Sequence, residues 1–286
     1  MKENLRKFTA LHKMENCADS IKAELLCLSR YEDAEKDIII VVHNQLDYIK
    51  NCIKSIEENT ENYNIFIWDN ASDQETKDYL KSLRHMVVRN EENIGFIRPN
   101  NRLFELGVAP YVILLNSDTE VKPNWDKALI SWLQQNENTA QTGYMGGLLD
   151  EELKGGIFDF GSNVDYICGW ATCIRRNLLD GYFDRLSADK NKFFASEFDE
   201  EPFLKLFDEK NLEFAYAEDA DLSLRIKEHG LEIYALHLDL VNHFENKTVK
   251  TVVDKVDLKR TFSKNHEYMR KRWSKFDKLL RNKELR

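Results

Sequence analysis

Polar side chains follow each of four predicted strands in the first half of the chain. Short apolar runs, such as Ile38 to Val42 and Tyr111 to Leu115, are typical of strands buried on both faces. The side chains after the four runs are His43 with Asn44, Asp69 with Asn70, Asn90 with Asn93, and Asn116 with Ser117 and Asp118. Open α/β sheets bind ligands at the carboxyl ends of their strands. The alternative is turn formation, which Asn and Asp also favour.

The chemistry expected at these strand ends depends on how a phosphate would be held. Neither GxGxxG nor GxxxxGK[ST] occurs, so the usual glycine-rich phosphate loops are absent from the sequence. A divalent cation held by carboxylates would replace such a loop, because hard cations prefer oxygen ligands. Asp118 directly follows a buried strand and is the first candidate ligand, with an Asx turn as its alternative.

A second acidic group lies much later, in the run Glu218-Asp219-Ala220-Asp221. This run opens a predicted helix that ends near Gly230. Acidic residues in a first helical turn are stabilised by the helix dipole, which explains them without any function. The functional interpretation is a general base that takes a proton from an attacking hydroxyl.

The elements that must position these residues alternate between strand and helix from Asp37 onward. Strands are predicted at 38–42, 65–68, 86–88 and 111–115, and helical spacing of apolar residues lies between and after them. Such alternation predicts an α/β fold with a mostly parallel sheet and helices on both faces.

The two ends of the chain differ from this pattern. Residues 1–36 have helical spacing of apolar residues and are predicted to form an appendage. Residues 255–286 contain 12 basic and 4 acidic residues, which is a net charge of +8. Since the whole chain has a net charge of −9, the rest of the chain carries −17. The predicted organisation is an N-terminal helical appendage (1–36), a central domain (37–253) and a basic C-terminal helical segment (254–286).

Composition excludes several classes of protein. An acidic body argues against general nucleic-acid binding. The longest clean apolar runs have five residues, whereas a membrane span needs about 20. Five Cys without a CxxC pair, and no apolar stretch resembling a secretion signal, fit a reducing compartment, so a cytoplasmic location is expected. The basic C-terminal helix either lies on an anionic membrane surface or packs on the acidic body.

Taken in order, the motifs resemble the family 2 glycosyltransferases with the GT-A fold. The similarity covers residues 37–244, and each piece is weak alone. The pieces are Ile40 to Asn44, Trp68 to Asp73, Asn93 to Phe96 with Asn100 and Asn101, Leu115 to Val121, Val164 to Gly169 running to Arg176, Glu218 to Leu222 with Leu224 and Arg225, and His243. The resemblance implies a GT-A type nucleotide-binding sheet.

The resemblance also implies roles for residues that would bind a nucleotide sugar. Asp69 would accept a hydrogen bond from the imide N–H of uracil or thymine, which suits a group that only accepts. Asn116-Ser117-Asp118 takes the place of the family's DXD motif, with Asn in place of the first Asp. Asp118 and His243 would hold a divalent metal, manganese or magnesium. The nucleotide-binding set would be His43, Asn44, Asp69, Asn93, Arg98, Asn116 and Ser117.

On the acceptor side, the resemblance implies that Gly169 and Trp170 lie beside the sugar and the acceptor. Asp219 would be the catalytic base, with Glu218 as the competing candidate. The stretch from Gly181 to Glu218 is longer than is expected for the family. It is interpreted as shaping the acceptor pocket, mediating self-association, or forming a surface excursion.

The predicted function is an inverting, metal-assisted transfer of a sugar from a nucleotide-diphosphate sugar, with UDP or dTDP favoured, to a hydroxyl of a glycan or lipid-linked glycan, as in polysaccharide biosynthesis. A nucleotidyltransferase that makes nucleotide sugars is one alternative, and a catalytically silent carbohydrate-binding scaffold is another. A location at the inner membrane surface, through the C-terminal helix, is also expected.

Overall fold

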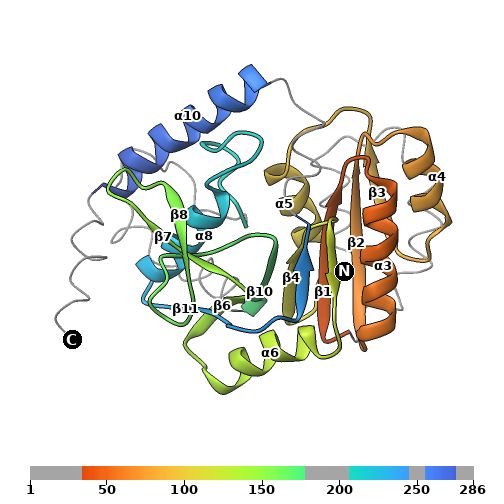
Figure 1. Ribbon diagram of the computed structural model, residues 1–286, viewed down its shortest axis with the longest axis horizontal. Helices are drawn as coiled ribbons and strands as arrows, with labels where there is room; N and C mark the ends of the chain where they lie inside the picture. The colour runs from red at the N-terminus through yellow and green to blue at the C-terminus, as the bar shows by residue number, and fades with distance from the viewer. Residues whose placement is uncertain (1–33, 178–205, 245–254, 275–286) are drawn as a thin grey trace.

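The computed structural model describes residues 34–177, 206–244 and 255–274. A seven-stranded sheet forms its centre (Figure 1). In spatial order its strands are β11 (Glu232–Ala235), β6 (Thr139–Gly143), β10 (Ala171–Arg175), β4 (Tyr111–Leu115), β1 (Lys36–Val42), β2 (Tyr63–Asn70) and β3 (Met86–Asn90). All neighbouring strands are parallel except β10, which runs antiparallel to both β4 and β6. The predicted mostly parallel sheet is confirmed.

Helices cover both faces of this sheet, also as predicted. The alternating side chains of β1 show the two layers, because Ile38 and Ile40 belong to one buried cluster and Ile39 to the other. The first cluster is closed by α3 (Leu46–Asn59), α4 (Gln74–Ser82) and α6 (Trp125–Gln135). The second is closed by α5 (Ile97–Leu106), α8 (Glu218–Glu228) and α10 (Lys255–Trp273).

Two smaller sheets complete the strand pairing. β12 (Val241–His243) pairs antiparallel with β5 (Thr119–Val121), so that His243 lies opposite Thr119. β7 (Gly146–Leu149) pairs with β8 (Gly155–Asp159) and β9 (Tyr166–Ile167). These sheets, together with β6, β10 and β11, were not predicted from the sequence.

The ends of the chain are only partly described. The predicted N-terminal helix lies outside the described residues, except that Lys36 already belongs to β1. The predicted C-terminal helix is present as α10, with Met269 and Trp273 completely buried against the second cluster. No helix of the described ranges is long and apolar enough to cross a bilayer. The division into three segments stays a prediction.

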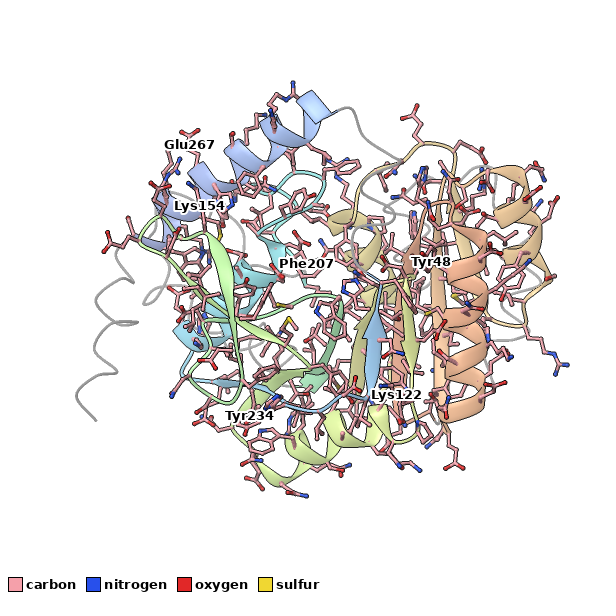
Figure 2. All side chains as sticks on the ribbon, viewed as in Figure 1. Tyr48, Lys122, Lys154, Phe207, Tyr234 and Glu267 are labelled. Carbon is pink, nitrogen blue, oxygen red and sulfur yellow. The ribbon has the colours of Figure 1, made fainter. Side chains whose placement is uncertain are left out.

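The segment before α8 packs into the body of the protein. Phe207 is buried near the middle of the molecule (Figure 2), and its ring lies 6.2 Å from that of Phe96. Asn101 fixes the same segment, since its side chain donates to the Phe207 carbonyl and accepts from the Phe207 N–H. Leu206, Phe207 and Leu212 are therefore part of the core, whereas residues 178–205 lie outside the described ranges.

Candidate active site

A cavity of about 310 Å³ opens at the carboxyl ends of the central strands. It brings together ten of the thirteen predicted site residues, from six separate stretches of the chain. These are His43, Asn93, Asn116, Ser117, Asp118, Gly169, Trp170, Glu218, Asp219 and His243. Asn44, Asp69 and Arg98 do not line it.

Asp118 and His243 form the centre of the cavity's polar side. The antiparallel pairing of β5 with β12 places His243 Nε2 at 3.3 Å from Asp118 Oδ1. A backbone hydrogen bond from Phe244 N–H to the Asp118 carbonyl, 3.0 Å long, fixes the register beyond the strand. Asn116 completes the group, with its side-chain nitrogen 3.4 Å from His243 Nε2.

This donor set fits a hard divalent cation that takes its remaining ligands from elsewhere. A carboxylate and an imidazole converge on one point of the cavity, and an amide lies beside them. Within the described ranges no group of three or more His, Cys, Asp or Glu residues is arranged to hold a metal alone. Diphosphate and water oxygens would have to complete the six or more ligands that such cations take.

Trp170 packs against His243 at the wall of the cavity. Its ring is stacked on His243, with centroids 5.0 Å apart and planes 12° apart. Tyr144 lies nearly parallel to it at 6.4 Å. Trp170 still lines the cavity, but its aromatic surface orients the imidazole of His243.

Another side of the cavity is formed by the turn after β1. Asn44 and Gln45 both have left-handed backbones, with φ of 57° and 62°, which turns the chain sharply from β1 into α3. His43 Nδ1 lies 2.6 Å from the Asn70 carbonyl, so this nitrogen donates and Nε2 is left to accept in the neutral ring. Asn44 does not line the cavity; its side-chain oxygen accepts from Asp73 N–H and supports the turn.

Asp69 is buried and is not among the residues that line the cavity. Its carboxylate is 1% exposed, pairs with Arg89 and accepts from the Ser72 N–H at 2.9 Å. The sequence analysis did not identify Arg89, since a lone Arg on a strand has no distinguishing pattern. A nucleobase that hydrogen-bonds to Asp69 would have to share its carboxylate with the Arg89 guanidinium. Arg98 is exposed on α5, away from the cavity.

Two adjacent carboxylates face the cavity from the first turn of α8. Asp219 is held by two backbone donors, with Gly169 N–H 3.2 Å from Oδ2 and Ala220 N–H 2.8 Å from Oδ1. Glu218 is 8% exposed, and its Oε2 has no hydrogen-bond partner among the described residues.

Burial raises the pKa of both carboxyls. For Glu218, burial is reinforced by the charge of Asp219, and its pKa rises to about 8. For Asp219, the raising effect of burial is opposed by the Ala220 and Gly169 N–H groups. Of the two carboxyls, Glu218 holds its proton more tightly, because the charge of Asp219 adds to the effect of burial on its pKa. Such a pair separates an acid role from a base role.

Several lining residues were not predicted as site residues. They are Val41, Asn70, Gly95, Phe96, Cys168, Phe214, Ala215, Tyr216 and Leu258. Asn70 donates to Asn93 Oδ1 at 2.7 Å and could have been found, because it follows a predicted strand. The stretch from Phe214 to Tyr216 carries no sequence signal of its own.

Comparisons with known proteins agree with this fold. Residues 37–152 match the sequence model of Glycosyl transferase family 2. An uncharacterized glycosyltransferase of Haemophilus influenzae is 26% identical over 122 residues, which are 40% of this chain and 38% of that protein. The chain thus matches well under half the length of this relative.

Solved glycosyltransferase structures share the fold at low sequence identity. The mannosyltransferase PcManGT from Pyrobaculum calidifontis, in complex with GDP-Man and Mn²⁺, has a TM-score of 0.51 at 13% identity, over 82% of this chain and 66% of that one. S. aureus TarS 1-349 in complex with UDP-GlcNAc has a TM-score of 0.53 at 14% identity, over 79% of this chain and 64% of that one.

Fold and sequence match together define what the chain resembles. Residues 37–152 are similar to Glycosyl transferase family 2, and the described residues share the GT-A fold of solved glycosyltransferases. The predicted resemblance and fold class are confirmed, and the predicted enzyme class, glycosyltransferase, is the one that the matched relatives share.

Proposed function

We propose that this protein transfers a sugar, with inversion, from a nucleoside-diphosphate sugar to a hydroxyl group of a glycan acceptor. The observation that carries the proposal is the convergence of Asp118 and His243 with Asp219 on one cavity. The first two residues suit the diphosphate end of a donor, and the third suits an attacking hydroxyl.

The cation site belongs to this proposal. Asp118 and His243 would hold a divalent metal, with Asn116 beside it and Trp170 keeping the imidazole in place. A bound cation supplies charge neutralisation for the departing diphosphate. The neighbour with GDP-Man and Mn²⁺ supports a metal of this kind in the same fold. The identity of the ion, manganese or magnesium, is part of the proposal.

In the proposed reaction Asp219 accepts the proton of the acceptor hydroxyl. The oxygen then forms a bond to the anomeric carbon while the bond from that carbon to the diphosphate breaks, and the nucleoside diphosphate leaves. Inversion follows because the acceptor attacks directly from the side opposite the leaving group. Glu218, whose pKa is raised by burial and by the charge of Asp219, is the weaker candidate for the base and can donate a hydrogen bond to the sugar or acceptor when protonated.

Preference for UDP or dTDP rests on Asp69. Each carboxylate oxygen has two acceptor positions, so pairing with Arg89 and Ser72 leaves room for one more donor. An imide N–H supplies that donor, whereas cytosine has an acceptor at the same place. The neighbour with UDP-GlcNAc supports a uridine nucleotide in this fold.

The acceptor and location are proposed from the surface of α10. Its exposed residues include Lys259, Arg260, Lys264, Arg270 and Lys271, with Glu267 among them. Figure 2 shows Glu267 pointing away from the body of the protein. A basic face of this kind attracts anionic lipid headgroups. It would place the protein in the cytoplasm at the inner surface of the membrane, where a lipid-linked glycan acceptor would lie.

The direct test incubates the protein with a panel of nucleotide sugars, with and without Mn²⁺, and measures the released nucleotide. We expect release of UDP, dependent on metal, and NMR of the transferred sugar should show the opposite anomeric configuration. Pyrophosphate as the product would instead indicate a nucleotidyltransferase. Binding without turnover of any donor would indicate a carbohydrate-binding scaffold.

A further inference from the structure

The backbone directly before the two carboxylates of α8 has an unusual conformation. Phe214, Tyr216 and Ala217 have φ of 58°, 77° and 70°, in the left-handed region that non-glycine residues rarely adopt. Ala217 is the residue that caps α8, immediately before Glu218. The direction in which α8 begins, and hence the place of Asp219, therefore depends on a segment that would not keep this conformation by itself.

Two elements hold this segment from different directions. The Phe214 carbonyl accepts from Phe96 N–H at 2.6 Å and from Ile97 N–H at 3.3 Å, at the start of α5. Gly95 makes this approach possible, since a Cβ there would lie 2.5 Å from the Phe214 oxygen. The carbonyls of Glu213, Ala215 and Tyr216 turn toward α10, whereas that of Ala217 accepts from Asp221 N–H of α8 at 2.9 Å.

A single side chain of α10 binds those carbonyls. Asn265 is completely buried, and its Nδ2 lies 2.9 Å from each of the Glu213, Ala215 and Tyr216 carbonyl oxygens. Its Oδ1 accepts from Glu213 N–H at 2.9 Å. In Figure 1, α10 (blue) lies along the cyan segment that leads into α8.

The rest of the buried face of α10 anchors the helix on either side of this contact. Tyr268 donates to Asp208 at 2.6 Å, and Trp273 donates to Asp221 of α8 at 3.0 Å. These positions recur at helical spacing from Asn265, so one face of α10 contacts the segment before α8 and α8 itself.

We propose that Asn265 is a positioning residue: it holds residues 213–217, three of which have left-handed backbones, in their observed conformation and thereby places Asp219 against Gly169 at the cavity. The basic C-terminal helix is thus a structural part of the active site as well as a surface. This inference rests on the proposed function for its catalytic consequence, but not for its structural one.

The test compares Asn265→Ala and Asn265→Asp with two controls on the same helix. Asn265→Asp keeps the size and the acceptor for Glu213 N–H but loses the donor to three carbonyls. Tyr268→Phe removes a buried hydrogen bond of α10 elsewhere, and Lys264→Ala removes the exposed ion pair with Glu213. For each variant, UDP affinity, kcat and KM of transfer, and amide hydrogen exchange are measured.

Both Asn265 variants should lower kcat by about 10- to 100-fold, the scale of a small displacement of a catalytic group, with UDP affinity unchanged. Exchange should become faster at residues 213–217 and at the Gly169 amide, which donates to Asp219, while β1 keeps its protection. Tyr268→Phe and Lys264→Ala should leave these measures near wild type.

Three outcomes would overturn the proposal. The first is wild-type kcat and Gly169 exchange in both Asn265 variants. The second is an equal loss of kcat in Tyr268→Phe, and the third is global unfolding of both Asn265 variants. Either of these two outcomes would indicate that Asn265 contributes only to general stability. If the wild-type protein transfers no sugar, the proposed function fails, and the exchange of Gly169 and residues 213–217 still decides the role of Asn265.

Discussion

His243 Nε2 lies 3.3 Å from Asp118 Oδ1, and both atoms face the same cavity. The two residues are far apart in the sequence and meet only because β12 pairs with β5. The pair supplies the candidate metal ligands of the proposed donor site, which lies directly beyond the carboxyl end of β4.

The first prediction concerns the cation. Mn²⁺ or Mg²⁺ should strengthen UDP binding to the wild-type protein, because Asp118 and His243 supply only part of a coordination shell and the diphosphate supplies more. Asp118→Ala and His243→Ala should each abolish this gain. Titration calorimetry with metal and with EDTA measures it. Arg98→Ala, an exposed change away from the cavity, is the control, and an unchanged UDP affinity in EDTA would contradict the assignment.

The second prediction concerns the base of the nucleotide. UDP should bind more tightly than CDP by roughly 10- to 150-fold, because one charge-assisted hydrogen bond to Asp69 contributes about 1.5–3 kcal/mol. Asp69→Asn should reduce the difference, since an amide can rotate to donate to cytosine. Competition binding of the two nucleotides gives the ratio. Equal affinities in the wild-type protein would remove Asp69 from the nucleoside site.

The fold was predicted largely from the sequence, because strands buried on both faces have continuous apolar runs that need no tertiary context. β4, for example, has the predicted bounds Tyr111–Leu115. β12 has three residues and no such run, so its pairing with β5 depends on contacts between distant segments. The contacts of Arg89 with Asp69 and of Asn265 with the 213–217 segment are equally non-local. Residue types alone did not reveal them.

The third prediction concerns stability and pH. The folded protein holds the proton of Glu218 more tightly than the unfolded chain, with a pKa of about 8 against 4.5. This contribution is complete below pH 4.5 and is lost as the pH rises through 8. Gln at this position stays neutral and does not lose this contribution. The free energy of unfolding of Glu218→Gln, relative to that of the wild type, should therefore increase as the pH rises. The gain is up to about 1.4 kcal/mol per pH unit in this window.

Urea denaturation in EDTA at several pH values between 5 and 8 measures this gain. Glu267→Gln, an exposed carboxyl on α10, is the matched control and should follow the wild-type curve. Parallel curves for Glu218→Gln and wild type would show that Glu218 is ionised in the folded protein.

The fourth prediction concerns a buried ion pair at the opposite end of the sheet. Lys36 at the start of β1 pairs with Asp126 of α6, and their side chains are 2% and 0% exposed. Asp126→Ala leaves the ammonium buried beside its weaker partner Glu35 and should lower the free energy of unfolding by about 3–5 kcal/mol. Lys127→Ala, which removes an exposed pair with Glu61, should change it by less than about 1 kcal/mol. Similar losses in the two variants would contradict the assignment of Asp126 as a structural anchor.

Asp219 is proposed as the base of a sugar transfer, and a comparison of Asp219→Asn with Glu218→Gln tests this assignment. UDP affinity and the rate of transfer are measured for each variant under single-turnover conditions. Asp219→Asn should keep UDP affinity and lose about 10²- to 10⁴-fold in rate, because only the proton acceptor is removed. Glu218→Gln, which resembles the protonated wild-type side chain, should lose far less. Near-normal transfer by Asp219→Asn, with transfer lost in Glu218→Gln, would contradict the account and place the base one residue earlier.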